Sequence, residues 1–546
     1  MHDTTGAAAP TPSAAREAIE RAETALGIEF GSTRIKAVLV DMDGRPLASG
    51  SHDWENQLVD GLWSYEEEMV REGLRSAFAD LARDVESTHG TPLRTTGSMG
   101  ISAMMHGYLA LDAHGRLLAP FRTWRNTNTG PAARELTELF SFNIPLRWSI
   151  AHLHQAMRDH EPHLADLASV TTLAGLVHRR LCGRHVLGVG DASGMFPVDP
   201  RTHDYDDALV DAYDALARAT GDLPPLRELL PEVLVAGQDA GSLTEEGARL
   251  LDPTGVFGAG VPMCPPEGDA GTGMVATRAV KPRTGTVSAG TSVFAMVVLE
   301  RSLGRVHPEL DLVATPEGFP VAMVHSNNGA SEWDQWVGVF SEFASAAGVD
   351  LPRHALYDLL YAQALQGPAD GGGLMAFNFL SGEPIVDLEH GRPLSLRNPG
   401  APLTLQAFMR TQLMTIFASL RVGMDILLQD EGVALDQLYA HGGLFKTPVV
   451  AQTVLAGALD TPITVGAGAG EGGPWGMALL ALYRARHGQG EGLSDFLERV
   501  AFADTASTTV RPDPSDVTGF QTFMERYRAD LPVARTAGQA YSVSGS

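Results

Sequence analysis

Three glycine-rich turns combine backbone N–H groups with hydroxyl or cationic side chains. They are Gly31-Ser32-Thr33, Gly290-Thr291-Ser292 and the run His441-Gly442-Gly443-Leu444-Phe445-Lys446. Converging N–H groups with a hydroxyl beside them can hold a phosphate without help from net charge. Each turn taken singly could also be an ordinary tight turn. Because the first two occupy the same place in two similar stretches of sequence, we favour phosphate binding.

A single acidic residue among glycines is the next candidate for chemistry. Asp269 lies in the segment PEGDAGTG (266–273), where small neighbours leave room for a ligand to approach the backbone. A loop Asp can also cap the helix that follows it. The sequence leaves both interpretations open.

Polar and aromatic residues follow a buried-looking strand at 99–103. His106 comes directly after this strand and before Gly107, and ligands bind at strand ends in α/β sheets. A buried structural histidine fits the same pattern. Trp124 and Asn126 could offer a sugar an apolar platform and an amide, or they could simply pack within a loop.

The elements that carry these residues alternate between strands and helices, which indicates the α/β class. Strand-like runs at 26–30, 34–41 and 45–50 form a β-meander, and an amphipathic helix follows at 69–85. A second meander at 285–300 again places a glycine-rich turn between two β-rich runs. We therefore expect an internal duplication.

Length supports two large domains, because 546 residues exceed the roughly 250–300 at which single cores stop growing. We place the boundary near residue 280. At the end of the chain, one amphipathic piece at 520–531 precedes a small, polar stretch that we expect to fray.

Composition excludes several function classes. A net charge of −26 disfavours nucleic-acid and membrane-surface partners. Two cysteines, Cys182 and Cys264, supply neither a disulfide framework nor a cysteine-rich zinc site, which fits a reducing cytoplasm. The apolar run 413–428 contains Arg421 and Asp425 before it reaches the roughly 18 residues of a membrane span.

Seven segments in order resemble the FGGY family of carbohydrate kinases, and within it the xylulokinase-like members. They are GIEFGSTRIKAVLVD (27–41), GISAMMHGYLALD (100–112), GVGDASGMFPVD (188–199), EGDAGTG (267–273), GTVSAGTSVF (285–294), FLSGEPIVD (379–387), and HGGLFKTP (441–448) with EGGPWGMALLA (471–481). This resemblance covers the chain from about residue 26 to about 510.

The resemblance implies two actin-like (ribonuclease H-like) domains that close over an interdomain cleft. A flexible tail (1–24) would precede an N-terminal domain (25–280) that binds sugar and carries the catalytic aspartate. A C-terminal domain (281–512) would bind ATP, and an extension (513–546) would follow. The implied reaction transfers the γ-phosphoryl group of ATP to a sugar hydroxyl, which demands positioning, charge neutralisation and a base.

The resemblance also assigns roles to residues. Asp269 would be the general base and, with Glu29, would hold Mg²⁺. The substrate-binding residues would be Met105, His106, Trp124, Asn126 and Asp269. The ATP-binding residues would be Gly31, Ser32, Thr33, Lys36, Gly290, Thr291, Ser292, Gly442, Gly443, Phe445 and Lys446.

Three departures from the family pattern are visible. Glu29 stands where most of the family has Asp, so magnesium would lie farther back or bind it through water. The family's Trp-x-Asp-x-Arg reads WRNTN (124–128), which replaces a charged pair by amides. The first family signature is only faint around 145–149, and no role follows from it.

We therefore expect a cytoplasmic, ATP- and Mg²⁺-dependent kinase of a ketose, a pentulose such as D-xylulose, that forms a homodimer. Ribulokinase-, fuculokinase- or polyol-kinase-like specificity is the alternative within the class, because a few polar contacts decide which hydroxyl pattern is accepted. A non-catalytic, ATP-sensing actin-like protein is the alternative from another class.

Overall fold

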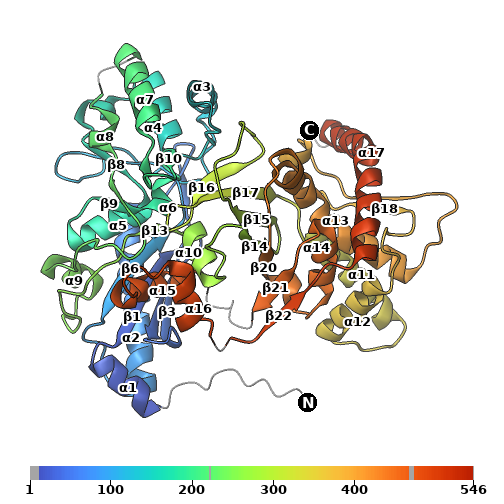
Figure 1. Cartoon of the computed structure of the whole chain (residues 1–546), viewed down its shortest axis with the longest axis horizontal. Coiled ribbons are helices and arrows are strands. Elements are labelled where there is room, and N and C mark those ends of the chain that lie inside the picture. Colours follow the sequence, from blue (N-terminus) through green and yellow to red (C-terminus); the bar gives the residue numbers. More distant parts are fainter. Residues whose placement is uncertain (1–11, 221–222, 467–471, 504, 545–546) are drawn as a thin grey trace.

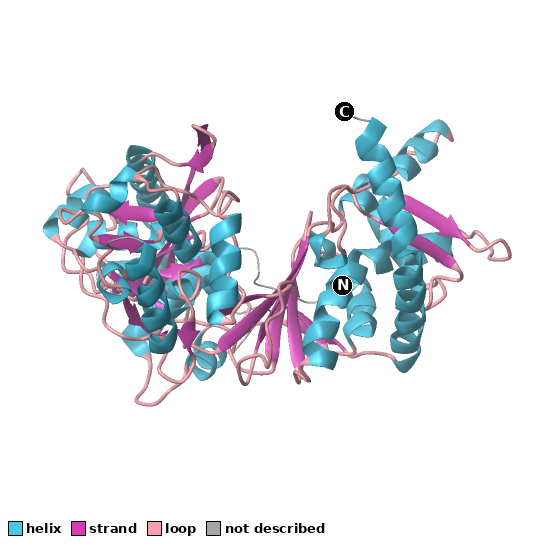
Figure 2. Ribbon diagram, turned by 90° about the horizontal axis from the view of Figure 1, so that it is seen from above, coloured by secondary structure: helices cyan, strands magenta, loops and turns pink. Residues whose placement is uncertain are grey.

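The computed structural model describes residues 12–220, 223–466, 472–503 and 505–544. Two α/β bodies lie side by side (Figures 1 and 2), as expected for an actin-like pair of domains. Residues 1–11 of the tail predicted at 1–24 lie outside the described residues, as does Glu471 of the EGGPWG segment. The described part opens with helix α1 (Pro12–Glu20).

The first body is built on a five-stranded sheet in the order β13-β6-β1-β2-β3. Its strands are β1 (Thr24–Phe30), β2 (Arg34–Asp41), β3 (Pro46–Asp53), β6 (Ser98–Ala103) and β13 (Glu267–Gly268). The predicted meander forms the antiparallel part, while β6 and β13 run parallel to β1. Because parallel strands end at the same edge of a sheet, the residues after β1, β6 and β13 meet there.

The second body repeats this arrangement. Its seven strands, in the order β16-β17-β15-β14-β20-β21-β22, are β14 (Thr284–Ala289), β15 (Val293–Val298), β16 (Asp311–Ala314), β17 (Pro320–Ser326), β20 (Gln437–His441), β21 (Ile463–Gly466) and β22 (Ser507–Val510). β17, β15, β14, β20 and β21 follow one another as β3, β2, β1, β6 and β13 do. The expected duplication is therefore present in the topology of the two sheets.

Helices and short strand pairs cover the first sheet. The helices are α2 (Glu67–His89), α3 (Gly130–Phe140), α4 (Ser149–Arg158), α5 (Leu173–Cys182), α6 (Val189–Ala192), α7 (Asp207–Thr220), α8 (Leu226–Leu229), α9 (Glu245–Leu251) and α10 (Asp269–Ala276). The short strands are β4 (Gln57–Val59), β5 (Leu62–Ser64), β7 (Leu109–Leu111), β8 (Ser169–Thr171), β9 (Val186–Gly188), β10 (Val198–Asp199), β11 (Asp204–Tyr205) and β12 (Glu232–Leu234). The predicted amphipathic helix at 69–85 is α2, whose Leu74, Phe78 and Leu81 are buried.

The remaining elements follow the second meander. They are α11 (Ser331–Ala346), α12 (Arg353–Leu365), β18 (Leu374–Phe377), β19 (Leu394–Arg397), α13 (Leu405–Asp425), α14 (Val450–Leu459), α15 (Gly472–Arg486), α16 (Leu493–Val500) and α17 (Pro514–Ser544). The helical stretch Leu405–Asp430 is long and apolar enough to cross a membrane, but 72% of its most apolar window is buried inside the protein, as in a core helix.

Helix α15 crosses back from the second half of the chain onto the first sheet, where Figure 1 shows it in red among blue and green elements. Gly27 in β1 permits the contact: a Cβ at this position would lie 2.1 Å from the Pro474 carbonyl oxygen and 2.4 Å from the Ala478 nitrogen. The side chains of Met477, Leu479 and other α15 residues join a core that includes residues of both sheets. Residues 472–486 thus pack with the first body.

The C-terminal extension corrects one expectation. The stretch after residue 531 was expected to fray, but α17 continues to Ser544. Phe523 and Tyr527 lie in the core of the second body, and the Arg535 guanidinium donates hydrogen bonds to the Val386 carbonyl oxygen. These contacts, and not an amphipathic pattern, hold the last turns of the helix.

Candidate active site

A cavity of about 410 Å³ lies between the two bodies. The first body lines it with Ser32, Met104, Met105, His106, Trp124, Arg147, Asp269 and Ala270, and the second with Ser292, Phe294, Met296, Asp311, Val313, Met323 and His325. Its volume falls within the roughly 300–1,000 Å³ typical of small-molecule sites. Six of the residues predicted from sequence are therefore brought to one cavity.

Asp269 is the first residue of α10 and follows β13. Because Gly268 pairs with Ala103 of β6, Asp269 comes beside Met105, whose N–H donates to Asp269 Oδ1 at 3.1 Å. The residue at the N-cap position of α10 is Gly268, not Asp269. Burial raises the pKa of Asp269. The structure thus favours the ligand-facing interpretation of this carboxylate over the capping one.

His106 lines the cavity in a left-handed backbone conformation, with φ of 69°. Its Nδ1 is 3.1 Å from the Gly194 carbonyl oxygen, which can only accept, so the proton is on Nδ1. Burial lowers the pKa of His106 to about 3, which keeps the ring neutral. Nε2 is then a hydrogen-bond acceptor suited to a hydroxyl group.

Trp124 and Asn126 take different positions. Trp124 is 40% exposed, lines the cavity, and its indole N–H donates to Ser32 Oγ at 3.3 Å. Asn126 is buried, accepts the Trp63 N–H and donates to the carbonyl oxygens of Trp63 and Thr123. The structure places Asn126 behind the cavity wall, where its amide orders the loop that carries Trp124.

Glu29 lies one residue before the end of β1, close to Asp269. Burial and then the charge of Asp269 raise the pKa of Glu29 to about 7, while Lys36, its partner in strand register, lowers it. A Cβ on Gly473 would lie 1.5 Å from Glu29 Oε2, so a side chain at 473 would displace the Glu29 carboxylate. A cation near both carboxylates would offset the effect of the Asp269 charge on Glu29.

These oxygens suit magnesium, which usually takes one or two protein carboxylates together with substrate phosphates and water. In the part of the chain that the structure describes, no group of three or more His, Cys, Asp or Glu side chains is arranged to hold a metal by itself. The residues present therefore fit an ion that shares its ligands with a phosphate substrate.

The predicted phosphate turns lie at neighbouring strand ends. Ser32 and Ser292, from the first and second turns, line the cavity from opposite bodies. β14 and β20 are parallel, and a Cβ on Gly442 would lie 2.4 Å from the Ala289 carbonyl oxygen, so the third turn packs against the second. The exposed residues Thr33, Thr291, Gly442, Gly443 and Lys446 belong to these turns. Phe445 instead lies in the core of the second body.

Nine of the residues that line the cavity have no role predicted from the sequence. Phe294, Asp311, Met323 and His325 come from the second body, and Arg147 comes from the segment to which no role was assigned. Arg147 forms an ion pair with Asp311 across the two bodies. Only the docking of one body on the other reveals this pair.

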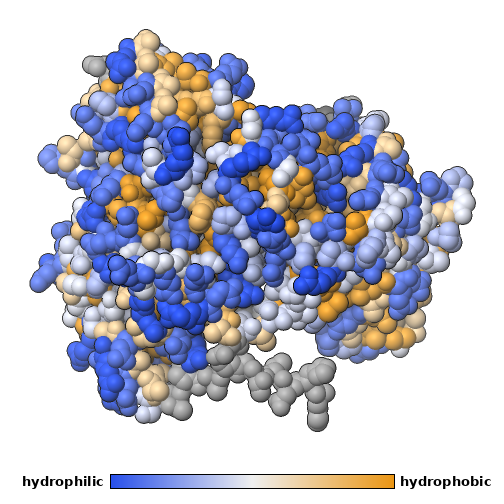
Figure 3. Space-filling model, viewed as in Figure 1, coloured by the Kyte–Doolittle hydropathy of each residue, from blue (hydrophilic) through white to orange (hydrophobic). Residues whose placement is uncertain are grey.

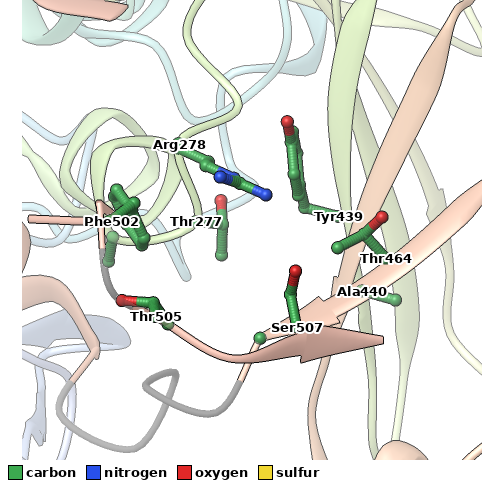
Figure 4. Close-up of a pocket in the computed structure, with 10 residues that line it drawn as sticks. Thr277, Arg278, Tyr439, Ala440, Thr464, Phe502, Thr505 and Ser507 are labelled. Carbon is green, nitrogen blue, oxygen red and sulfur yellow. The ribbon is translucent and has the colours of Figure 1, made fainter. Parts of the chain in front are cut away.

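A second cavity, of about 40 Å³, lies where α10 meets the second sheet (Figure 4). The Arg278 guanidinium lies over the rings of Tyr439 and Phe502, with its carbon 4.9 Å and 5.6 Å from their centroids. It also pairs with Glu498 at 3.1 Å. This space is too small for a sugar or a nucleotide, and its residues join the elements that connect the two bodies.

Comparisons with known proteins agree with this arrangement. A family model described as the FGGY family of carbohydrate kinases, N-terminal domain, matches residues 24–270, and the C-terminal domain model of the same family matches residues 285–485. The xylulose kinase of Haemophilus influenzae is 22% identical over 522 residues, covering 93% of this chain and 99% of its own.

Solved structures share the fold. A xyloylose kinase from Brucella ovis superposes with a TM-score of 0.73 at 19% identity, over 94% of this chain and 100% of that chain. A gluconate kinase from Lactobacillus acidophilus gives a TM-score of 0.74 at 16% identity, over 94% and 99% of the two chains.

Proposed function

The chain belongs to the FGGY family of carbohydrate kinases, and from this premise we propose that it transfers the γ-phosphoryl group of ATP to a hydroxyl of a ketose, a pentulose such as D-xylulose. The protein is a sugar kinase, a phosphotransferase with an alcohol group as acceptor. The family shows the class of reaction, and the identity of the sugar is our proposal.

One observation carries the proposal: the Asp269 carboxylate shares a cavity with His106 and with the serines of two predicted phosphate turns, one from each body. A neutral imidazole and a carboxylate are suited to a polyhydroxyl compound, and the turns are suited to phosphate oxygens. The apolar side chains of Phe294 and Met323 complete the wall.

In the proposed reaction, Asp269 accepts the proton of the sugar hydroxyl as the hydroxyl oxygen attacks the γ-phosphorus. The bond to the bridging oxygen breaks, and ADP leaves with its electron pair. The Met105 N–H holds one oxygen of Asp269 in place. The N–H groups of the turns stabilise charge on the phosphoryl oxygens, because transfer of this kind depends on positioning and electrostatics.

Glu29 and Asp269 are the residues that would hold Mg²⁺, which when bound supplies neutralisation of phosphate charge. Lys36, beside Glu29, would add a further positive charge near the first turn. Their role is supported by the charge of Asp269, which raises the pKa of Glu29 and which a cation would offset.

A sugar acid is the second candidate substrate class. The structurally similar gluconate kinase carries this class in its name. Ribulokinase-, fuculokinase- and polyol-kinase-like specificities stay alternatives, because they differ by single hydroxyl orientations. An ATP sensor without kinase activity is the alternative from another class.

ADP release measured with MgATP across a panel of ketoses, polyols and aldonates tests the proposal. We expect turnover that depends on sugar, with the highest kcat/KM for a pentulose. Nucleotide binding without release of ADP on any sugar would instead support the sensor, and an aldonate with the highest kcat/KM would support the second candidate.

We also propose a cytoplasmic homodimer. Exposed apolar side chains of Val339 and Phe343 on α11 and Leu359 on α12 offer an apolar surface, over which Figure 3 shows hydrophobic residues at the lower right. Sedimentation velocity checks this: the native chain is expected to sediment as a dimer, and a native monomer would contradict it.

A further inference from the structure

An ion pair between the two bodies forms part of the cavity wall. Arg147 Nη2 of the first body contacts Asp311 Oδ2 of the second, and both residues line the cavity that holds Asp269 and His106. Their side chains are 29% and 18% exposed, so each is only partly covered. Each therefore retains hydrogen-bonding capacity on the cavity side.

The backbone of Arg147 is fixed relative to His106. The Gly107 N–H donates to the Arg147 carbonyl oxygen at 3.1 Å, and Ser149 Oγ donates to the Gly107 carbonyl oxygen at 2.5 Å. The Trp148 ring packs over the His106 ring with centroids 6.3 Å apart. Arg147 thus stands in a defined position beside the end of β6.

Asp311 is held just as firmly, because β16 is anchored to the first body on either side of it. Asn143 Nδ2 donates to the Leu310 carbonyl oxygen at 2.9 Å, and the Ala314 N–H donates to Ser193 Oγ at 2.8 Å. Figure 1 shows β16 at the edge of the second sheet, reaching over the first body. The Asp311 carboxylate reaches the cavity because this edge strand packs against the first body.

Among the described residues, the charged groups that line the cavity are one guanidinium and two carboxylates, those of Arg147, Asp269 and Asp311. The two histidines add no positive charge, because burial lowers the pKa of both His106 and His325. The one cation is already neutralised by Asp311. A carboxylate on a ligand would therefore lie near the negative charges of Asp269 and Asp311, while the positive charge of Arg147 is already paired with Asp311.

On this basis, and resting on the proposed function, we propose that Arg147 and Asp311 form a hydroxyl-reading pair that selects uncharged sugars and excludes sugar acids. A hydroxyl both donates and accepts, so neighbouring hydroxyls can accept from the guanidinium and donate to the carboxylate. A hydrogen-bonding site of this type rejects an unsuitable ligand strongly, because its buried polar groups would lose their partners.

Asp311→Asn tests the pair through a gain of binding. The substitution keeps the shape and removes the charge that neutralises Arg147, so the affinity for D-gluconate relative to D-xylulose should rise roughly tenfold or more. Arg147→Met should lower the affinity for D-xylulose by a similar factor, should not bind D-gluconate, and should bind ATP with unchanged affinity. Asp436→Asn is the control, since Asp436 belongs to an exposed ion pair of the second body with Arg283.

Calorimetry with each sugar, and ADP release in parallel, separates the outcomes. A gluconate-to-xylulose ratio within twofold of native in both variants would overturn the inference, as would native preference for D-gluconate or binding of neither sugar. If the ratio shifts but ADP is never released, the pair stands and the kinase proposal fails. Retained ATP affinity shows that each variant is folded.

Discussion

At the scale of residues, the site is defined by two neighbouring carboxylates whose pKa values are raised. Desolvation is the largest cause for both Glu29 and Asp269, and the charge of Asp269 raises the pKa of Glu29 further. Such perturbed groups cluster at functional sites because burial and like charge are what catalysis exploits. We expect both carboxylates to need a cation that neutralises their charge when substrate binds.

Asp269→Asn should abolish turnover and spare nucleotide binding. The amide keeps the hydrogen bond from Met105 but cannot accept a proton, so kcat should fall by roughly 10²–10⁴. ADP release measures the first effect and calorimetry with ATP the second. Asp436→Asn serves as the control, and native activity in Asp269→Asn would exclude the base role.

Glu29 predicts an unusual pH dependence of stability in the metal-free protein. Its pKa is raised from 4.5 to about 7 in the folded state, so the folded chain holds a proton that the unfolded chain releases. The contribution is fully present below pH 4.5 and is lost as pH rises through 7; it amounts to at most about 3 kcal/mol.

Thermal unfolding at pH 6 and pH 8 checks the Glu29 prediction. The native chain should lose more stability over this interval than Glu29→Gln, which cannot ionise. MgCl₂ with ATP should reduce the difference in lost stability between the native chain and Glu29→Gln, because a bound cation offsets the negative charge of Glu29. Equal losses in the two proteins would show that Glu29 ionises normally.

At the scale of elements, parallel strand ends and one crossing helix assemble the site. β1, β6 and β13 end together at Phe30, Ala103 and Gly268, while α15 packs over β1 through Gly27. The contact between β1 and α15 is backbone to backbone, which leaves no space for a side chain. The position of Gly473 beside Glu29 depends on this crossing.

Gly27→Ala should therefore destabilise the protein. Its Cβ would lie 2.1 Å from a backbone oxygen that cannot move independently of α15, and overpacking of this kind costs about 1–3 kcal/mol. Gly338→Ala in α11 is the matched control, since its Cβ meets nothing within 4 Å. Denaturant unfolding compares them; equal stability of the two variants would contradict the close packing.

At the scale of the whole molecule, the two bodies meet along connecting elements and along β16. Arg278 at the end of α10 joins Tyr439 of the second sheet to Glu498 of α16. Because domain closure excludes water from the reacting groups, residues at such junctions influence catalysis from a distance.

Arg278→Ala should change kcat and the KM values for both substrates together, although Arg278 does not line the catalytic cavity. It removes a cation–π contact and an ion pair between elements that connect the bodies, and so alters the balance between open and closed forms. Steady-state kinetics measures this, with Arg283→Ala, from a nearby exposed ion pair, as the control. Native kinetics in Arg278→Ala would assign it a purely structural role.

The sequence by itself determined the α/β class, the duplication and six of the residues that line the cavity. The Gly-rich turns and Asp269 can be recognised in the sequence because adjacent residues encode their local conformation. Periodic apolar patterns locate α2 and the meanders. Confirmation of the family rests on the order of these segments.

Tertiary structure alone decided what surrounds those residues. Arg147 and Asp311 are far apart in the chain and meet because β16 docks on the first body. Helix α15 packs on the first sheet although it comes from the second half of the chain. Asn126 supports a loop, and Phe445 lies in the core of the second body. None of these contacts leaves a local pattern, because each depends on the packing of distant surfaces. The proposed catalytic groups are local features of the sequence, whereas the rest of the cavity wall comes from the assembly of the two bodies.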